Sequence, residues 1–188
     1  VWTRLAKAAA SVEADPSSWE PAFLWLLDDF RFVPGGRIWA GMGTGTAVTC
    51  YNCFVIPVAP VAGHEGAGRD SRRAIMDTLA TMVELMSRGG GVGINLSSLR
   101  PRGSYVARVN GKSSGAVSWG ALDSFATGLV EQGGSRRGAL MLILEDWHPD
   151  LLEFVTAKRQ MGQLTNANIS VGISDAFMEA VREGRDWE

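Results

Sequence analysis

The sequence has little of what several classes of protein require. Its 188 residues include only two cysteines and two histidines, too few cysteines for the disulfide framework of a small secreted protein. A zinc site would need both histidines from distant loops, so we expect no metal centre. No hydrophobic run approaches the roughly 18 residues of a membrane-spanning helix, and the first residues do not have the order of a signal peptide. We therefore expect a cytoplasmic protein with no membrane partner.

An excess of one charge is also missing. The chain carries 18 Lys and Arg residues against 20 Asp and Glu residues, for a formal net charge of -2, and it has no basic run. Direct binding to nucleic acid is therefore not expected, because it depends on clustered positive charge. The 46% hydrophobic content is typical of a globular core, so we expect small molecules or proteins as partners.

Short apolar runs alternate with stretches of helical period along most of the chain. The pattern predicts strands at residues 53–56, within the glycine-dense passage 88–95, at 140–144 and at 169–173, and helices through residues 19–27, 71–87, 119–129, 149–155 and 174–181. Residues 97–114 are expected to form a long polar loop. Strands that alternate with helices predict an α/β fold with a parallel sheet.

Several residues in this pattern have conventional structural interpretations. Asp70 stands where an N-cap residue would accept the free backbone donors of a helix. Trp19, Trp25 and Trp119 fall on helical stretches, and we expect all three in the core.

Glycine-rich segments raise the question of nucleotide binding, but the standard fingerprints do not fit. Residues 89–95 lack the spacing of a dinucleotide-binding motif, and residues 111–113 lack the earlier glycine that a P-loop requires. Arg136 and Arg137 stand between glycines, where they suit either a solvated turn or contact with a phosphate or a base edge. The pattern alone leaves both interpretations open.

Cys50 and Cys53 form a C-x-x-C sequence. In a cytosolic α/β protein this spacing occurs in thiol redox pairs and in halves of zinc sites. Two small, buried side chains beside a strand are an equally simple interpretation, because free cysteine packs well in cores. The spacing does not decide between them.

Four segments, taken in order, resemble the catalytic subunit of ribonucleotide reductase. They are VPGGRI at 33–38, NCFVIP at 52–57, GGVGIN at 90–95 followed by LRPRG at 99–103, and QGGSRRGA at 132–139. The later stretches HPD at 148–150, EF at 153–154, KR at 158–159 and NANISV at 166–171 are most similar to the adenosylcobalamin-dependent class II branch. The resemblance covers nearly the whole chain.

This resemblance implies a fold. Residues 34–188 would form the first half of a ten-stranded α/β barrel, built from parallel strands with crossover helices, and residues 1–33 would form a short helical segment before it. The family's finger loop, its second redox cysteine and its later phosphate-binding turn have no counterpart in this sequence. The isolated chain is therefore not expected to turn over nucleotides.

The resemblance also implies roles at a substrate site. Cys53 would be one of the two thiols that supply the reducing electrons, with its partner thiol in the family's second half-barrel. Asn52 would lie beside the substrate ribose, and Gly91 would let the nucleoside approach the main chain. Gln132 and Arg136 would lie in a loop between substrate and effector, where they carry the specificity signal.

A second implied site would bind a deoxynucleoside triphosphate effector. Asp70 would hydrogen-bond its sugar, Ser87 would lie near its base, Arg100 would meet its phosphates, and Val106 would be an apolar neighbour. For the whole enzyme the resemblance implies adenosylcobalamin as cofactor, a ribonucleotide substrate, a thioredoxin-like reductant and a homodimer.

Two other functions remain open at this point. The chain could be a non-catalytic, nucleotide-binding half of a split or truncated reductase that keeps only the effector site. It could also be a C-x-x-C thiol oxidoreductase, which would exchange disulfides without any nucleotide.

Overall fold

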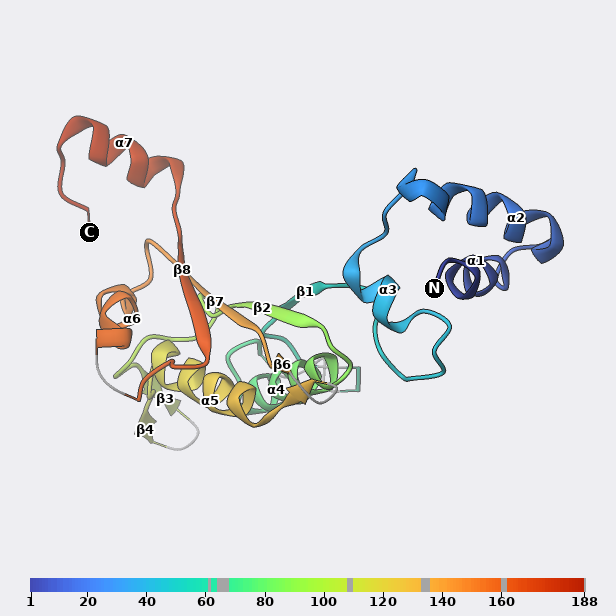
Figure 1. The fold of residues 1–188 in the computed structure, drawn as a ribbon. Helices are drawn as coiled ribbons and strands as arrows, with labels where there is room; N and C mark the ends of the chain where they lie inside the picture. The colour runs from blue at the N-terminus through green and yellow to red at the C-terminus, as the bar shows by residue number, and fades with distance from the viewer. Residues whose placement is uncertain (61, 64–67, 108–109, 133–135, 160–161, 188) are drawn as a thin grey trace.

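A computed structural model of the chain describes residues 1–60, 62–63, 68–107, 110–132, 136–159 and 162–187 (Figure 1). The helices are α1 (Trp2–Ala10), α2 (Pro16–Leu27), α3 (Gly36–Gly41), α4 (Arg72–Ser87), α5 (Ala116–Leu129), α6 (Leu151–Thr156) and α7 (Asp175–Glu183), with short 3-10 turns η1 (Asp28–Phe30) and η3 (Ala157–Arg159). The strands are β1 (Cys53–Pro57), β2 (Gly91–Asn95), β3 (Tyr105–Val106), β4 (Gly111–Lys112), β5 (Glu131–Gln132), β6 (Arg136–Arg137), β7 (Leu140–Glu145) and β8 (Ala167–Gly172). In the described part of the chain, no helix is long and apolar enough to cross a membrane.

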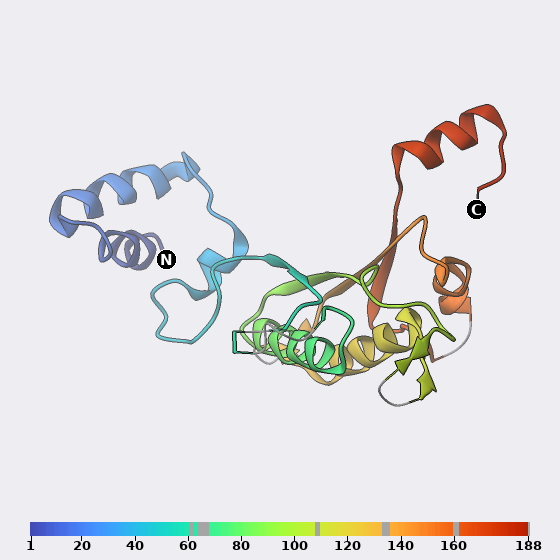
Figure 2. The same cartoon turned by 180° about the vertical axis from the view of Figure 1, so that it is seen from behind.

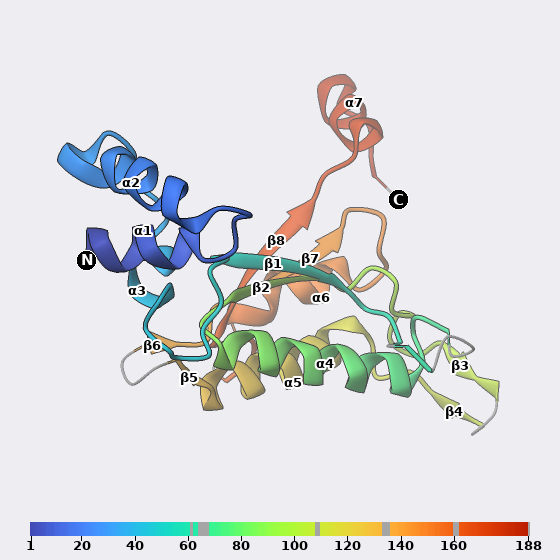
Figure 3. The same ribbon diagram turned by 90° about the vertical axis from the view of Figure 1, so that its right-hand side faces the viewer.

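The central sheet has four parallel strands in the order β1-β2-β7-β8. The order of these four strands in the sheet is the same as their order in the chain. Their first residues lie at one end of the sheet, with Cys53 opposite Gly91 and Leu140 opposite Ala167. Helices α4 and α5 lie side by side against one face of this sheet (Figure 3). The predicted α/β fold with a parallel sheet is confirmed.

The main core lies between this sheet and its helices. The strands contribute fully buried aliphatic side chains, such as Ile94 and Leu142, which pack with Met82 and Met86 of α4. Burying each such side chain away from water stabilises the folded state by about 1.5–3 kcal/mol. At Gly120 of α5, an added Cβ would come within 3.0 Å of Leu142, so α5 can lie this close to the sheet only because the residue has no side chain.

The first three helices form a second, smaller core that lies apart from the sheet (Figures 1 and 2). Its buried members are Leu5, Ala6 and Leu27. Helix α1 is not among the helices predicted from periodicity, but it falls within the helical segment at residues 1–33 that the resemblance implies, and its apolar side chains gather on one face. The prediction that Trp19 and Trp25 are core residues is wrong, since these two residues of α2 are 46% and 61% exposed.

The segment between β2 and α5 is more ordered than the predicted polar loop. Strands β3 and β4 pair antiparallel in a small hairpin, with Tyr105 opposite Lys112. Two-residue strands are too short to produce the alternating pattern by which strands are predicted. The β5–β6 hairpin is equally short, and it lies at the opposite end of α4 from β3–β4 (Figure 3).

Candidate functional site

A cavity of about 730 Å³ lies beside the beginning of α4. Its walls come from the segment that enters α4, from the β2–α5 connection with its β3–β4 hairpin, and from the first turns of α5. Asp70, Arg100 and Val106, three of the residues assigned to the effector, all line it. This volume is within the range of pockets that bind small molecules.

Asp70 and Arg100 face each other across this cavity as an ion pair. The Arg100 Nε donates to Asp70 Oδ2 at 2.5 Å, and its Nη1 donates to the carbonyl of Tyr105 at 3.3 Å. The hydrogen bond from Arg100 lowers the pKa of Asp70, and the same bond raises the pKa of Arg100. The prediction that Asp70 caps α4 is wrong, because the cap is Ser71, whose Oγ accepts from the backbone N–H of Ala74 at 3.1 Å.

The charged residues in the lining of the cavity are mainly cationic. Arg72, Arg73, Arg100 and Lys112 line it, and Asp70 is the single acid among the described lining residues. The beginning of α4 adds the partial positive charge of a helix N-terminus. Together these groups favour an anionic ligand.

Part of the wall is apolar. Ile75 and Leu99 are buried there, while Val106 and Trp119 are partly exposed. A ligand with several negative charges and one flat, apolar portion would match both parts of the lining.

Ser87 does not line this cavity. It is the last residue of α4, whose 16 residues span about 24 Å, whereas Asp70 precedes the first. The side chain is exposed and its Oγ donates to the carbonyl of Glu84 at 2.8 Å. Within one chain, the structure therefore brings Asp70, Arg100 and Val106 together but leaves Ser87 at the far end, and its role stays a prediction.

The residues assigned to the substrate lie at the other end of the sheet. Cys53 begins β1 and is exposed, and Gly91 begins β2 directly opposite it. The Gly91 N–H donates to the Asn52 carbonyl at 2.8 Å, and a Cβ added at Gly91 would lie 3.4 Å from the Cys53 Sγ. The structure thus brings Asn52, Cys53 and Gly91 together and leaves the thiol uncrowded. Cys50 is also a free thiol and is partly buried.

Gln132 and Arg136 pair across the β5–β6 hairpin, which reaches this same end of the sheet just before β7. Residues 133–135, which include Gly133 and Gly134, lie outside the described residues, as do the side chains of Gln132 and Arg136. At Gly138 an added Cβ would come within 2.9 Å of the Thr127 carbonyl, so the backbone returns to β7 through a place that excludes a side chain.

Comparison with known families agrees with this geometry. The family model described as ribonucleotide reductase, barrel domain, matches residues 51–188. The chain belongs to the ribonucleotide reductase family. This confirms the resemblance identified from the sequence.

Individual reductases are similar over most of the chain. A vitamin B12-dependent ribonucleoside-diphosphate reductase of Mycobacterium tuberculosis (strain H37Rv) is 39% identical over 178 residues, which cover 93% of this chain and 24% of the relative. An enzyme of the same name from Thermoplasma acidophilum is 36% identical over 155 residues, covering 82% of this chain and 19% of the relative. The ribonucleoside-diphosphate reductase subunit alpha of Chlamydia trachomatis is 27% identical over 192 residues, covering 99% of this chain and 17% of its own. The chain therefore spans about a quarter or less of these reductases.

Several lining residues of the cavity, among them Arg72, Arg73, Lys112 and Trp119, were missed by the sequence interpretation. Lys112 was considered only as part of a P-loop, and Trp119 only as a core residue. Trp119 does pack against the core, and it also lines the cavity. Lys112 directly follows Asn110 and Gly111, a pair typical of a turn, and shortly precedes a helix, and this position was the available signal.

Proposed function

We propose that this chain is part of the catalytic subunit of a ribonucleotide reductase, to which it contributes one redox cysteine and the binding site for a deoxynucleotide effector. The observation that carries the proposal is the shared cavity of Asp70, Arg100 and Val106, which come from separate segments of a chain in this family. Four parallel strands added in chain order, with α4 and α5 on one face, are compatible with half of a ten-stranded barrel.

In the effector site, the cationic part of the cavity would hold the triphosphate. Arg100 and Lys112 supply donors that match phosphate oxygens. Asp70 would accept a hydrogen bond from a sugar hydroxyl with the oxygen that Arg100 leaves free. The base would then lie against the apolar wall that includes Val106 and Trp119.

At the substrate site, Cys53 would supply half of the reducing equivalents. As the ribose 2'-hydroxyl leaves as water, two thiols lose two electrons and two protons and become a disulfide, and the 2'-carbon gains a hydrogen. The exposure of Cys53 and the missing side chain at Gly91 support this role, because ribose can approach the sulfur. A thioredoxin-like dithiol would afterwards reduce the disulfide.

The resemblance implies adenosylcobalamin as the cofactor of the whole enzyme, and the names of the vitamin B12-dependent relatives support this part of the proposal. Among the described residues, His148 is buried and both of its ring nitrogens are hydrogen-bonded, to the Leu99 carbonyl and the Asp150 N–H. Asn52 and Val55, which are exposed near Cys53, are not histidines and so lack the imidazole that commonly binds a metal. His148 is therefore not free to bind cobalt, and no step above runs through the cofactor. A homodimer and a cytoplasmic location are likewise part of the proposal.

The test is to titrate deoxynucleoside triphosphates into the protein by calorimetry. Replacing Arg100 with Gln should weaken binding roughly 10- to 100-fold, because a charge-assisted hydrogen bond to phosphate is lost. The matched control is Arg88→Gln, which removes an exposed arginine at the far end of α4 and should leave binding unchanged. Equal binding by all three proteins would overturn the proposed effector site.

A further inference from the structure

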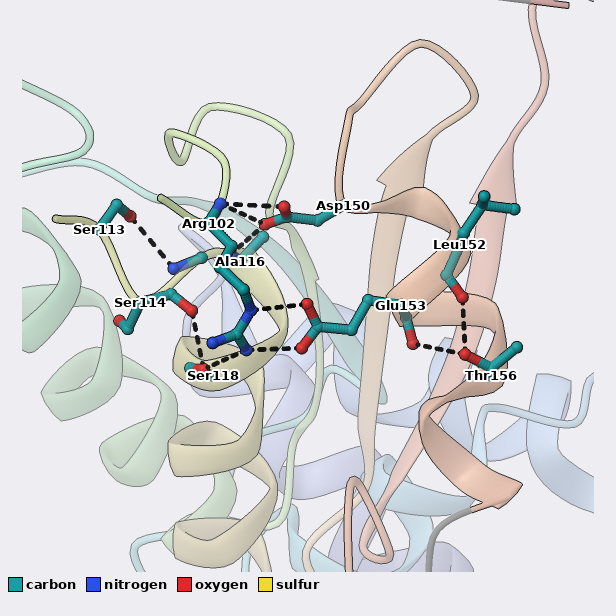
Figure 4. Close-up of polar contacts among 10 residues, drawn as sticks. Arg102, Ser113, Ser114, Ala116, Ser118, Asp150, Leu152, Glu153 and Thr156 are labelled. Carbon is teal, nitrogen blue, oxygen red and sulfur yellow. Dashed lines mark hydrogen bonds and ion pairs between the residues drawn. The ribbon is translucent and has the colours of Figure 1, made fainter. Parts of the chain in front are cut away.

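The loop that carries Arg100 is anchored on both sides of that residue. Before it, the carbonyl of Leu99 accepts a hydrogen bond of 2.8 Å from His148 Nε2. After it, the backbone N–H of Arg102 donates to both carboxylate oxygens of Asp150, at 2.9 and 3.2 Å (Figure 4). Both anchors come from the segment between β7 and α6, which is distant in sequence.

Asp150 also fixes the beginning of α5. Its Oδ2 accepts from the N–H of Ala116, the first residue of that helix, at 2.8 Å (Figure 4). The N-cap position is Gly115, which has a φ of +87° and no side chain to cap the helix itself. A Cβ there would come within 2.7 Å of Asp150 Oδ2. One buried carboxylate therefore serves as the helix cap and as the anchor of the Arg100 loop.

An ion pair closes the same junction on its outer side. Arg102 donates to Glu153 of α6 through Nε at 2.8 Å and through Nη2 at 2.6 Å, and its Nη2 also donates to Ser118 Oγ of α5 at 3.1 Å (Figure 4). This two-bond geometry is the most specific that arginine forms with a carboxylate. The Arg102 side chain thus joins the loop, α5 and α6.

From this geometry we propose that Asp150 and Glu153 are positioning residues for anion binding in the cavity. Neither lines the cavity, and each acts through the backbone or side chain of Arg102. By holding Arg102 just after Arg100, while His148 holds Leu99 just before it, they direct the Arg100 side chain across the cavity towards Asp70. A ligand then meets an arginine whose backbone is already ordered, so less conformational entropy is lost on binding. The inference rests on the proposed effector site and assigns it a support outside the cavity.

The first experiment separates positioning from simple stability. Glu153→Gln should weaken binding of deoxythymidine triphosphate about 2- to 30-fold, and Glu153→Asp, which keeps the carboxylate, should recover part of that loss. In an Arg100→Gln background, Glu153→Gln should have no further effect, because the group it positions has gone. Glu84→Gln removes a comparable exposed ion pair with Arg88 and is the matched control. Unchanged affinity in Glu153→Gln, or an equal loss with and without Arg100, would overturn the proposal.

A second measurement does not depend on the nucleotide. In the full chain labelled with nitrogen-15 arginine, the Nε–H signal of Arg100 is assigned by its loss in Arg100→Gln. Asp150→Asn keeps the size of the side chain but loses one acceptor oxygen, and it should move this signal towards that of a solvated arginine. If the signal moves in Asp150→Asn but the wild-type protein binds no nucleotide, the positioning role of Asp150 is supported and the proposed effector site is rejected. An unmoved signal would reject the role of Asp150.

Discussion

The two ends of the parallel sheet differ in how they are built. At the end near the start of α4, charged side chains from separate segments meet in a walled cavity, and Asp70 and Arg100 already pair across it. At the other end, Cys53 lies exposed at the first residue of β1, beside a glycine, and Val55 on the same strand is 85% exposed. One end is formed by interactions within the described chain, whereas the other presents a reactive group on an open surface.

The difference between the two ends indicates which part of the proposed function, anion binding or thiol reduction, the described fold can support by itself. Binding an anion requires fixed donors in a partly enclosed space, and the cavity has both. Reduction by a thiol pair requires a second sulfur, and the sequence has only one other cysteine, Cys50. The ends can therefore be tested separately, because a change at one should leave the other intact.

The largest expected effect is at the open end. In the full reductase, Cys53→Ser should lower multiple-turnover, dithiol-dependent reduction at least about 1,000-fold, the scale on which enzymes lose activity when one member of a catalytic unit is removed. Serine cannot form the disulfide that carries the two electrons away. Deoxynucleotide binding, measured by calorimetry on the same variant, should be unchanged because the cavity is at the other end of the sheet.

Cys50→Ser is the matched control for this experiment. It removes the other thiol of the C-x-x-C sequence, which has no role in the proposed reaction, and activity should persist. If Cys50→Ser abolished activity as Cys53→Ser does, the two cysteines would form the redox pair themselves. Parental turnover in Cys53→Ser would reject its assigned role.

The sequence predicted the scaffold well because its signals are local. The apolar run of β7 and the helical period of α4, including its last residue Ser87, agree with the structure. Such patterns require only that each element bury one face. The two-residue strands were missed because their order comes mainly from pairing with other segments.

The site was less predictable, because its contacts join distant residues. Asp70 has the local context of a helix cap, yet its carboxylate pairs with Arg100, 30 residues later. Likewise, the family resemblance included Arg102 and Asp150 in separate segments but assigned no contact between them. Spacing in a single sequence contains no information on such pairs, whereas family membership indicated which positions to examine.

A substitution in α5, away from both the cavity and Cys53, should change the free energy of unfolding without affecting nucleotide binding or the reactivity of Cys53. Asp123 of α5 is 5% exposed, and burial raises its pKa to about 7. The unfolded chain ionises near pH 4, so the folded state loses stability as the pH rises from about 4 to 7. Asp123→Asn removes this cost and should raise the free energy of unfolding at pH 8 by up to about 4 kcal/mol. Urea titration measures it.

At pH 3 the wild-type protein and Asp123→Asn should have nearly equal stability, because the carboxyl is then largely protonated in both states. Nucleotide affinity and the rate of Cys53 alkylation should not change. A lower stability of the variant at pH 8 would mean that the Asp123 carboxylate makes a stabilising interaction in the folded protein.

The smallest expected effect is the loss of the Asp70–Arg100 ion pair at the cavity end, whose contribution to stability depends on pH. The hydrogen bond from Arg100 lowers the pKa of Asp70 below 3.8, so the pair contributes its full stability above that pH and loses it as the pH falls through the lowered value. At pH 6, Asp70→Asn should reduce the free energy of unfolding by at most about 1 kcal/mol, because the Asp70 and Arg100 side chains are 26% and 38% exposed and solvent screens them. The difference should shrink in high salt and decline as the pH falls through the lowered pKa of Asp70, while alkylation of Cys53 at pH 6 stays at the wild-type rate. Urea titrations of both proteins at pH 6, in low and in high salt, test this, and a difference that salt did not reduce would show that the two side chains stabilise the fold by packing rather than by charge.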